Sequence, residues 1–219
     1  MAQQILIIGL GHFGMSLAKT LSEKGAEVLA VDKRINRVEE ASAFVTEAVV
    51  MDATDEAELA KLEPKKRDSS VCTIGEDSKD ASIICTALLR QMGAPLVISR
   101  ASDKMHQRIL SLVGAHQVVD PEQEFGYRFA NKLLFKNIII DNEMGENMHL
   151  TEMCVLPEMI GKTLIELALP KRFGVMVVAI RKGQSGKLFQ PNPSEPLDKD
   201  DTMIIVSTES AIPKLIKGV

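Results

Sequence analysis

The segment Gly9-Leu10-Gly11-His12-Phe13-Gly14 constrains the fold of this 219-residue chain more than any other feature of the sequence. It follows an apolar run at residues 5–8 and opens a stretch, residues 13–24, whose apolar residues have helical spacing. Between a buried strand and a helix, a G-x-G-x-x-G segment makes a tight turn, lets the backbone approach a pyrophosphate and lets the helix pack on the strand. The free N–H groups at the helix start then face the phosphates. The pattern therefore predicts a nucleotide-binding turn in a parallel α/β sheet.

Strand-like and helical patterns alternate through the first 120 residues. The predicted strands cover residues 5–8, 28–31, 48–51, 71–74, 96–99 and 117–119, and the predicted helices cover residues 13–24, 37–43, 56–62, 80–92 and 103–113. Runs that are apolar on both faces are typical of parallel strands covered by helices on both sides. We therefore predict the α/β fold class: a Rossmann-type, doubly wound, parallel six-stranded sheet with right-handed crossovers.

The remainder of the chain has a different pattern. A predicted helix at residues 122–135 carries Phe125, Phe129, Leu133 and Leu134 at helical spacing but has no further strand to cover, so we expect a connector or dimer helix. An acidic, glycine-containing break is predicted at residues 141–147. We therefore expect an N-terminal nucleotide-binding domain at residues 1–140 and a C-terminal domain at residues 146–219. The C-terminal domain is predicted to be a small α+β unit, with strands at residues 151–156, 175–181, 187–189 and 203–206, a hairpin turn at 183–186, and helices at 163–169 and 211–217.

Asp32 is the main candidate for recognising a ribose. It lies 18 residues after Gly14, at the end of the second predicted strand, close to the roughly 20 residues expected of dinucleotide-binding units. Its carboxylate could accept two hydrogen bonds from a ribose diol, and its charge disfavours a 2′-phosphate. The alternative is a glycine-lined turn beside an acidic strand end, with no ligand at all.

Other strand ends should line the same crevice, because ligands in open α/β sheets bind at the carboxyl ends of the strands. The candidate cofactor-binding residues are Gly9, Leu10, Gly11, His12, Phe13, Gly14, Asp32, Lys33, Arg37, Asp52, Ala53, Thr54, Thr73, Ile74, Gly75, Glu76 and Arg100. Asp52 and Thr54 could instead cap a helix. Gly75 could serve a plain turn, and Arg100 could be a solvated strand end.

Composition narrows the range of functions. Lys and Arg number 26 against 30 Asp and Glu, and the formal net charge of −4 argues against a nucleic-acid-binding protein. No apolar run approaches the length of about 20 residues that spans a membrane. No signal peptide is visible, so we expect a cytoplasmic protein. Cys72, Cys85 and Cys154 are expected to be buried thiols rather than disulfide or zinc-binding residues.

The sequence also offers no catalytic constellation. An oxidoreductase needs an acid/base group beside the nicotinamide, and the predicted C-terminal domain offers one histidine, His149. We therefore expect a binding protein that is not an enzyme. An NAD-dependent oxidoreductase remains the alternative, because one fold serves many functions. A redox-sensing transcription factor of this fold would need a basic recognition helix, and none is visible in the sequence.

Several motifs, in order, resemble an RCK domain (regulator of conductance of potassium). In the N-terminal half they are Ile-Ile-Gly-Leu-Gly-His-Phe-Gly at residues 7–14, Val-Leu-Ala-Val-Asp ending at Asp32, Asp-Ala-Thr-Asp-Glu from Asp52, Ile-Gly-Glu from Ile74, and Gly-Ala-His-Gln-Val-Val-Asp-Pro-Glu ending at Glu122. In the tail, Gly-Lys-Thr-Leu-Ile-Glu-Leu from Gly161, Phe-Gly at residues 173–174, residues 191–197 and Asp-Thr-Met-Ile-Ile-Val from Asp201 are similar to the C-terminal RCK lobe. Essentially the whole chain resembles the KtrA/TrkA-type cytosolic subunits of bacterial potassium transporters.

The resemblance implies a non-catalytic cytosolic subunit that gates a membrane potassium transporter of the Ktr or Trk type. It also implies homodimers that assemble into an octameric ring, with ATP, ADP or NAD(H) bound in the crevice. Carried over by position, Asp32 would hold the ribose and residues 9–14 the phosphates, while residues 52–54 and 73–76 would border the adenosine. Arg100 would lie near the phosphates. Glu122 would lie at an intersubunit cation, either a divalent cation or Na⁺, unless it only complements a helix dipole.

This chain departs from the resemblance at two places. KtrA-type proteins usually carry an Arg that reaches a terminal phosphate where this chain has His12, so we expect weak preference for ATP over ADP, or AMP or NAD as the ligand. Some KtrA proteins bind cyclic di-AMP through an Arg and an Asn that flank the Phe/Tyr-Gly turn. Pro170 and Met176 stand at those positions here, so we expect no cyclic di-AMP binding.

Overall fold

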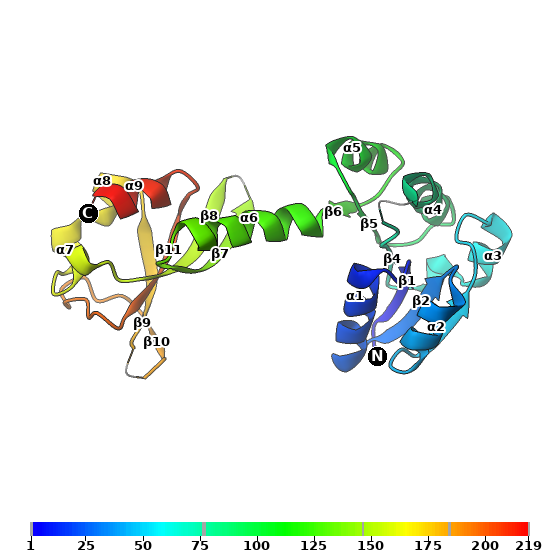
Figure 1. Cartoon of the computed structure of the whole chain (residues 1–219), viewed down its shortest axis with the longest axis horizontal. Coiled ribbons are helices and arrows are strands. Elements are labelled where there is room, and N and C mark those ends of the chain that lie inside the picture. The colour runs from blue at the N-terminus through cyan, green and yellow to red at the C-terminus, as the bar shows by residue number, and fades with distance from the viewer. Residues whose placement is uncertain (1, 76–77, 146, 184, 219) are drawn as a thin grey trace. The chain divides into compact units, whose positions relative to one another are not determined.

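The computed structural model describes residues 2–75, 78–145, 147–183 and 185–218. They form two compact units, Met1–Glu122 and Gln123–Val219, which Figure 1 colours from blue to green and from green to red. The division falls in the first turn of helix α6 (Pro121–Leu134). Our sequence analysis expected the division later in the chain, between residues 140 and 146.

The first unit is a parallel sheet of six strands in the order β3-β2-β1-β4-β5-β6. The strands are β1 (Gln4–Ile8), β2 (Glu27–Asp32), β3 (Glu47–Val50), β4 (Ser69–Cys72), β5 (Val97–Arg100) and β6 (Gln117–Val119). The helices are α1 (His12–Glu23), α2 (Ile35–Ser42), α3 (Glu56–Lys61), the 3₁₀ helix η1 (Pro64–Lys66), α4 (Lys79–Gln91) and α5 (Lys104–Leu112). This architecture confirms the predicted Rossmann-type fold. The strand order reverses between β1 and β4, the point at which such sheets bind ligands.

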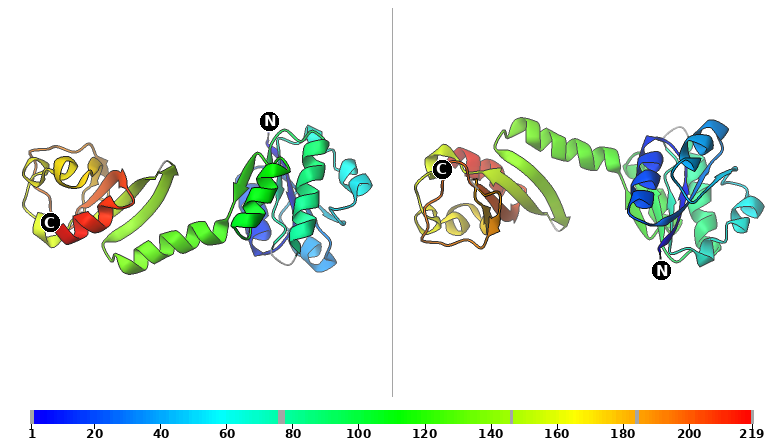
Figure 2. Two further views of the ribbon diagram at one scale, coloured as in Figure 1. Left: turned by 90° about the horizontal axis from the view of Figure 1, so that it is seen from above. Right: turned by 90° about the horizontal axis from the view of Figure 1, so that it is seen from below.

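Alternate residues of β1 enter two separate cores, one on each face of this sheet. Leu6 and Ile8 pack under α3 and α4, whereas Ile5 and Ile7 pack under α1 and α2. Figure 2 shows helices on both faces of the sheet. The double coverage explains why the strand is apolar without interruption, since a sheet covered on both sides buries both sets of its side chains.

The second unit is an antiparallel sheet of five strands in the order β10-β9-β11-β8-β7. Its strands are β7 (Ile138–Gly145), β8 (Met148–Cys154), β9 (Met176–Arg181), β10 (Leu188–Phe189) and β11 (Thr202–Thr208). Its helices are the greater part of α6, the 3₁₀ helix η3 (Pro157–Met159), α7 (Leu164–Leu167), α8 (Leu169–Phe173) and α9 (Ala211–Gly218). The core joins Met153, Met203 and Ile205 of the sheet to Leu167 of α7 and Leu215 of α9. A small α+β unit was predicted, and the structure confirms that class.

Strand β7 covers residues 141–145 of the segment that we expected to be an acidic break, so that prediction is wrong for these residues. The strand starts with Ile138-Ile139-Ile140, whose β-branched side chains favour extended backbone, and it pairs along its length with β8. Its acidic Asp141 is buried, because three polar neighbours donate hydrogen bonds to its carboxylate. The composition of this segment suggested a loop, but its pairing with β8 makes it a strand.

The helix predicted at residues 163–169 is interrupted. Thr163 caps α7 in a capping box with Glu166, as its sequence favours. Ala168 then adopts a left-handed conformation (φ 47°, ψ 40°), and α8 begins directly after it with Pro170 in its first turn, where a proline is tolerated. The β9–β10 hairpin is present in the register Leu188 opposite Arg181, and Gln184 of the predicted turn lies outside the described residues.

Within the described part of the chain, no helix combines the length and the apolar character that crossing a membrane requires.

Candidate nucleotide-binding site

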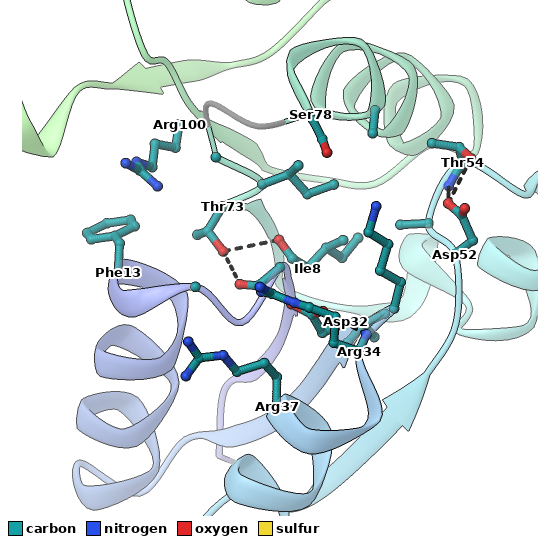
Figure 3. Close-up of a pocket in the computed structure, with 18 of the residues that line it drawn as sticks. Ile8, Phe13, Asp32, Arg34, Arg37, Asp52, Thr54, Thr73, Ser78 and Arg100 are labelled. Atoms are coloured by element: carbon teal, nitrogen blue, oxygen red, sulfur yellow. Dashed lines mark hydrogen bonds and ion pairs between the residues drawn. The ribbon is translucent and has the colours of Figure 1, made fainter.

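A pocket of about 800 Å³ lies at the carboxyl ends of the strands on either side of the switch point. Figure 3 shows its side chains converging from β1, β2, β4, the start of α1 and the segment after β3. It is lined by Ile8, Gly9, Gly11, His12, Phe13, Val31, Asp32, Lys33, Arg34, Arg37, Met51, Asp52, Ala53, Thr54, Thr73, Ile74, Gly75, Ser78, Ala81, Arg100 and Glu122. Three of the candidate residues predicted from the sequence are not among these lining residues. Leu10 and Gly14 lie behind the pocket, and Glu76 lies outside the described residues.

The glycine turn is shaped by two close approaches of backbone. Gly9 has φ +98°, and a Cβ there would lie 2.9 Å from the backbone nitrogen of Ile74. A Cβ on Gly14 would overlap the carbonyl oxygen of Gly9 and lie 2.5 Å from the hydroxyl of Thr73. Around Gly11, by contrast, no described heavy atom beyond its chain neighbours would come within 4 Å of a Cβ. The turn therefore packs tightly from behind and leaves Gly11, the N-cap of α1, open toward the pocket.

Asp32 is held by donors of the chain itself. It is 6% exposed, and its carboxylate accepts hydrogen bonds from the backbone N–H of Leu10 at 2.6 Å and of Arg34 at 2.9 Å. The Arg34 guanidinium donates two more, from Nε at 3.1 Å and from Nη2 at 3.2 Å. Burial acts to raise the pKa of Asp32, but these hydrogen bonds and the charge of Arg34 outweigh it and hold the pKa below the usual value. Asp32 is therefore a carboxylate at neutral pH.

Arg34 is the main pocket residue that sequence reasoning missed. The glycine pattern specifies an acidic residue at the end of the second strand, and nothing in it marks the residue two positions later. Leu10 has a role that differs from direct ligand binding, because its side chain is buried and its N–H fixes Asp32. The other unpredicted lining residues include Ile8, Val31 and Met51, which give the pocket apolar walls.

Asp52 and Thr54, after β3, form a local turn beside the pocket. Asp52 Oδ1 accepts hydrogen bonds from the backbone N–H of Thr54 at 2.9 Å and from its hydroxyl at 2.7 Å, drawn as dashed lines in Figure 3. These bonds lower the pKa of Asp52. The N-cap of α3 is Asp55, whose side chain accepts from the N–H groups of Ala57 and Glu58. The capping role that we left open for Asp52 and Thr54 therefore belongs to Asp55.

Thr73 and Gly75 extend the wall formed by β4. The Thr73 hydroxyl donates to the carbonyl oxygens of Ile8 at 3.1 Å and Gly9 at 2.5 Å, so this side chain ties β4 to the glycine turn. Gly75 lies beside Arg100, whose Nη1 would be 3.2 Å from a Cβ at that position. A side chain on Gly75 would therefore press against the guanidinium.

Arg100 and Glu122 form an ion pair at the rim of the pocket. Arg100 Nη2 lies 2.5 Å from Glu122 Oε1 and Nε lies 3.3 Å from Oε2, while the guanidinium stands 6.0 Å from the centre of the Phe13 ring. The described residues contain no group of three His, Cys, Asp or Glu side chains that could hold a metal ion. A cation at Glu122, which the resemblance implied, stays a prediction that would need further ligands.

The charges suit a ligand with phosphate groups. Lys33, Arg34, Arg37 and Arg100 all line the pocket. The start of α1 adds backbone N–H groups and the positive end of a helix dipole, the combination that binds phosphates at helix N-termini. Apolar side chains around Met51 and Ile74 offer a surface for a flat base. The pocket can therefore hold an anion and an apolar ring at the same time.

The strand order and the glycine turn define a Rossmann-type protein with a second, antiparallel unit. A family model for the TrkA-N domain matches residues 5–121, and a model for the TrkA-C domain matches residues 155–217. The chain therefore belongs to the KtrA/TrkA family of RCK proteins, as the sequence motifs predicted. The two models leave most of α6 and all of β7 and β8 between them.

Curated relatives cover the whole chain. It is 34% identical to the Ktr system potassium uptake protein A of Vibrio alginolyticus, over 99% of this chain and 97% of that protein. It is 32% identical to the Ktr system potassium uptake protein C of Bacillus subtilis, over 100% and 98% of the two chains.

Solved structures support the fold. The GsuK RCK domain has a TM-score of 0.65 at 19% identity, over 98% of this chain and 47% of that one. The GsuK channel bound to NAD has a TM-score of 0.65 at 20% identity, over 99% and 40%. This chain thus spans less than half of each. A KtrA RCK C domain in complex with cyclic di-AMP has a TM-score of only 0.30, which has no bearing on this chain, and our expectation against that ligand stays a prediction.

Proposed function

We propose that this chain is a nucleotide-sensing regulatory subunit of a Ktr- or Trk-type potassium transporter, and that it is not an enzyme. The observation that carries the proposal is the pocket at the switch point, which combines the α1 N-terminus, the carboxylate of Asp32 and a group of basic side chains. The relatives named as Ktr potassium uptake proteins support the transport role. The GsuK structures bound to NAD and to ADP support an adenine nucleotide as the ligand.

In this proposal each group of pocket residues binds a different part of the nucleotide. Asp32 accepts hydrogen bonds from the ribose, and residues 9–14 with the α1 N-terminus hold the phosphates. Arg100, Lys33 and Arg37 add positive charge around the phosphates. Residues 52–54 and 73–76 border the adenosine, and Glu122 stands where a cation would join a neighbouring subunit. ATP and ADP are the first candidates, with NAD(H) and AMP as the others.

The proposed partner surfaces are a second copy of the chain and the transporter. On α6, Phe125, Phe129, Leu133 and Leu134 are 60%, 48%, 67% and 73% exposed. An apolar stripe of this kind marks an interaction surface, which supports a homodimer and, by the family resemblance, an octameric ring beneath the membrane subunit. The protein would then work in the cytoplasm. Light scattering should return a mass well above the 24.0 kDa of one chain, and a monomer at micromolar concentration would contradict the dimer.

Hydride-transfer chemistry finds little support in the pocket. The single tyrosine of the chain, Tyr127, lies in the second unit, and among the described lining residues His12 is the only histidine. A turnover assay with NAD⁺ and a panel of alcohols and hydroxy acids should therefore show no reduction of the cofactor. Steady NADH formation would favour the oxidoreductase alternative.

Calorimetry with ADP, ATP, AMP and NAD⁺ tests the binding step directly. At least one nucleotide should bind, and Asp32→Ala should weaken it about tenfold or more, because the ribose loses its acceptor and the Leu10 N–H of the phosphate-binding turn loses the carboxylate that fixes it. Glu39→Ala, which removes an exposed carboxylate on α2 outside the pocket, is the matched control. If no nucleotide binds the wild-type chain, the proposal is wrong. In proteoliposomes with the transporter subunit, potassium flux should depend on the nucleotide with wild type and not with Asp32→Ala.

A further inference from the structure

The carboxylate of Asp32 has no acceptor capacity left over. An ionised carboxylate offers about four lone-pair sites on its two oxygens. Oδ2 accepts from the Leu10 N–H and from Arg34 Nη2, and Oδ1 accepts from the Arg34 N–H and from Arg34 Nε. The residue that should recognise a ribose is therefore saturated by donors of its own chain.

Two of these four donors are fixed and two are movable. The Leu10 N–H belongs to the buried glycine turn, and the Arg34 N–H belongs to the N-cap of α2. The guanidinium stands at the end of a flexible side chain that is 52% exposed, against 5% for the Asp32 side chain. Figure 3 shows the two side chains together at the edge of the pocket. Only the guanidinium can leave Asp32 without unfolding the turn or the start of α2.

A ribose diol brings two O–H donors, so it needs two of the sites that Arg34 fills. We propose that the Arg34 guanidinium is a built-in competitor for Asp32, which a ribose diol must displace, and that it thereby sets how strongly the pocket selects for the 2′-hydroxyl. This inference rests on the proposed function, namely that the pocket binds an adenine nucleotide through Asp32.

The exchange has a definite consequence for selectivity. When a ribose diol binds, its two hydroxyls donate two hydrogen bonds to Asp32, and the Arg34 guanidinium gives up its two hydrogen bonds to Asp32. When a 2′-deoxyribose binds, its single hydroxyl donates one hydrogen bond to Asp32, and the Arg34 guanidinium can keep one of its two. The two ligands therefore differ little in the net number of bonds to Asp32. The wild-type protein should discriminate weakly between ADP and 2′-deoxy-ADP.

Removal of the guanidinium should restore the discrimination. In Arg34→Ala only water competes for the two sites, so loss of the 2′-hydroxyl should cost a hydrogen bond to a charged acceptor, which corresponds to about tenfold in affinity. The ratio of the two dissociation constants isolates this effect, because the two ligands carry identical phosphates. Arg34→Lys keeps the charge but loses the two-pronged geometry, and its ratio should fall between those of the other two proteins.

Calorimetric titration of ADP and 2′-deoxy-ADP into wild type, Arg34→Ala, Arg34→Lys and Arg37→Gln tests the inference. Arg37 also lines the pocket but pairs with Glu40 rather than with Asp32, so Arg37→Gln removes the same charge. It should weaken both ligands alike and leave their ratio at the wild-type value. Thermal unfolding of each variant checks that it is folded.

Three outcomes would overturn the inference, and they are distinguishable. ADP binding with an equal ratio in wild type and Arg34→Ala would mean that Arg34 only braces the start of α2. Tighter binding of NADP⁺ than of NAD⁺ that disappears in Arg34→Ala would make Arg34 a receptor for a 2′-phosphate. Failure of the wild type and Arg34→Ala to bind any nucleotide would overturn the proposed function and this inference with it.

Discussion

The side chains of Asp141 and His149 meet inside the second unit, with His149 Nδ1 3.2 Å from Asp141 Oδ1. Both residues are at least nine-tenths buried. The same carboxylate accepts from the Thr151 hydroxyl at 2.9 Å and from Asn131 Nδ2 at 2.8 Å. One carboxylate thus ties α6 to β7 and β8.

Asp141→Ala should destabilise the second unit by about 3 kcal/mol, because it leaves the buried donors of His149 and Thr151 and the half-buried donor of Asn131 without an acceptor. Tyr127 lies against His149, with ring centroids 5.8 Å apart, so tyrosine fluorescence during urea unfolding reports this region. Glu143→Ala, an exposed site on the same strand, should stay within about 0.5 kcal/mol of wild type. Equal unfolding midpoints for the two variants would contradict the role of Asp141.

Gly14→Ala and Gly11→Ala should separate the structural and the ligand-facing parts of the turn. A Cβ at residue 14 overlaps backbone that cannot rotate away, so Gly14→Ala should cost about 3 kcal/mol or more of stability. Gly11 has φ −66° and open space, so Gly11→Ala should cost less than about 1 kcal/mol. It should nevertheless weaken nucleotide binding, because a methyl group intrudes on the phosphates. Comparable losses of stability in both variants would show that this division is wrong.

Asp103, the N-cap of α5, should make a pH-dependent contribution to the stability of the first unit. The side chain of Lys79, 2.6 Å away, and the His106 N–H lower the pKa of Asp103 from 3.8 to about 2. Because the pKa is lower in the folded state, the contribution is complete above pH 3.8 and is lost as the pH falls toward 2. In thermal unfolding, the stability difference between wild type and Asp103→Asn should shrink across this interval. A difference that stays constant down to pH 2 would argue against the ion pair.

His12→Arg should raise the preference for ATP over ADP. His12 lies at the first position of α1 and lines the pocket, and an arginine there is longer and always charged. An added charged hydrogen bond to a terminal phosphate corresponds to about tenfold in the ratio of affinities. His12→Gln, which adds no charge, should keep the wild-type ratio. The idea fails if calorimetry gives the same ratio for both variants.

The first unit could be predicted well from sequence because its signals are local. Each strand is a short apolar run, and each connecting helix has its own periodicity, so the alternation from β1 to β6 is visible without tertiary information. The glycine turn then places the pocket, since the first strand of such a sheet adjoins its switch point. Most candidate residues line the pocket for this reason.

The parts that sequence reasoning missed depend on contacts between distant residues. Strand β7 was hidden because burial of Asp141 needs partners on α6 and β8, and a sequence pattern shows none of them. Arg34 was missed because its importance comes from a side-chain conformation that folds back on Asp32. The break at Ala168 is a left-handed residue that is not glycine, and Pro170 signals a helix boundary nearby without showing that a second helix starts at Leu169.

The floor of the pocket at Gly9 and Gly11 is built from main chain, and this has a consequence for how the family can diverge. A substitution leaves the peptide groups in place, so the phosphate-facing part of the site is disturbed only when a side chain is added at one of these glycines. The rim of the pocket consists of long side chains, those of Lys33, Arg34, Arg37 and Arg100. A change of one base in the gene can replace any of them. Descendants of this protein should therefore come to differ in which nucleotide they prefer, while the ability to bind a nucleotide is inherited almost unchanged.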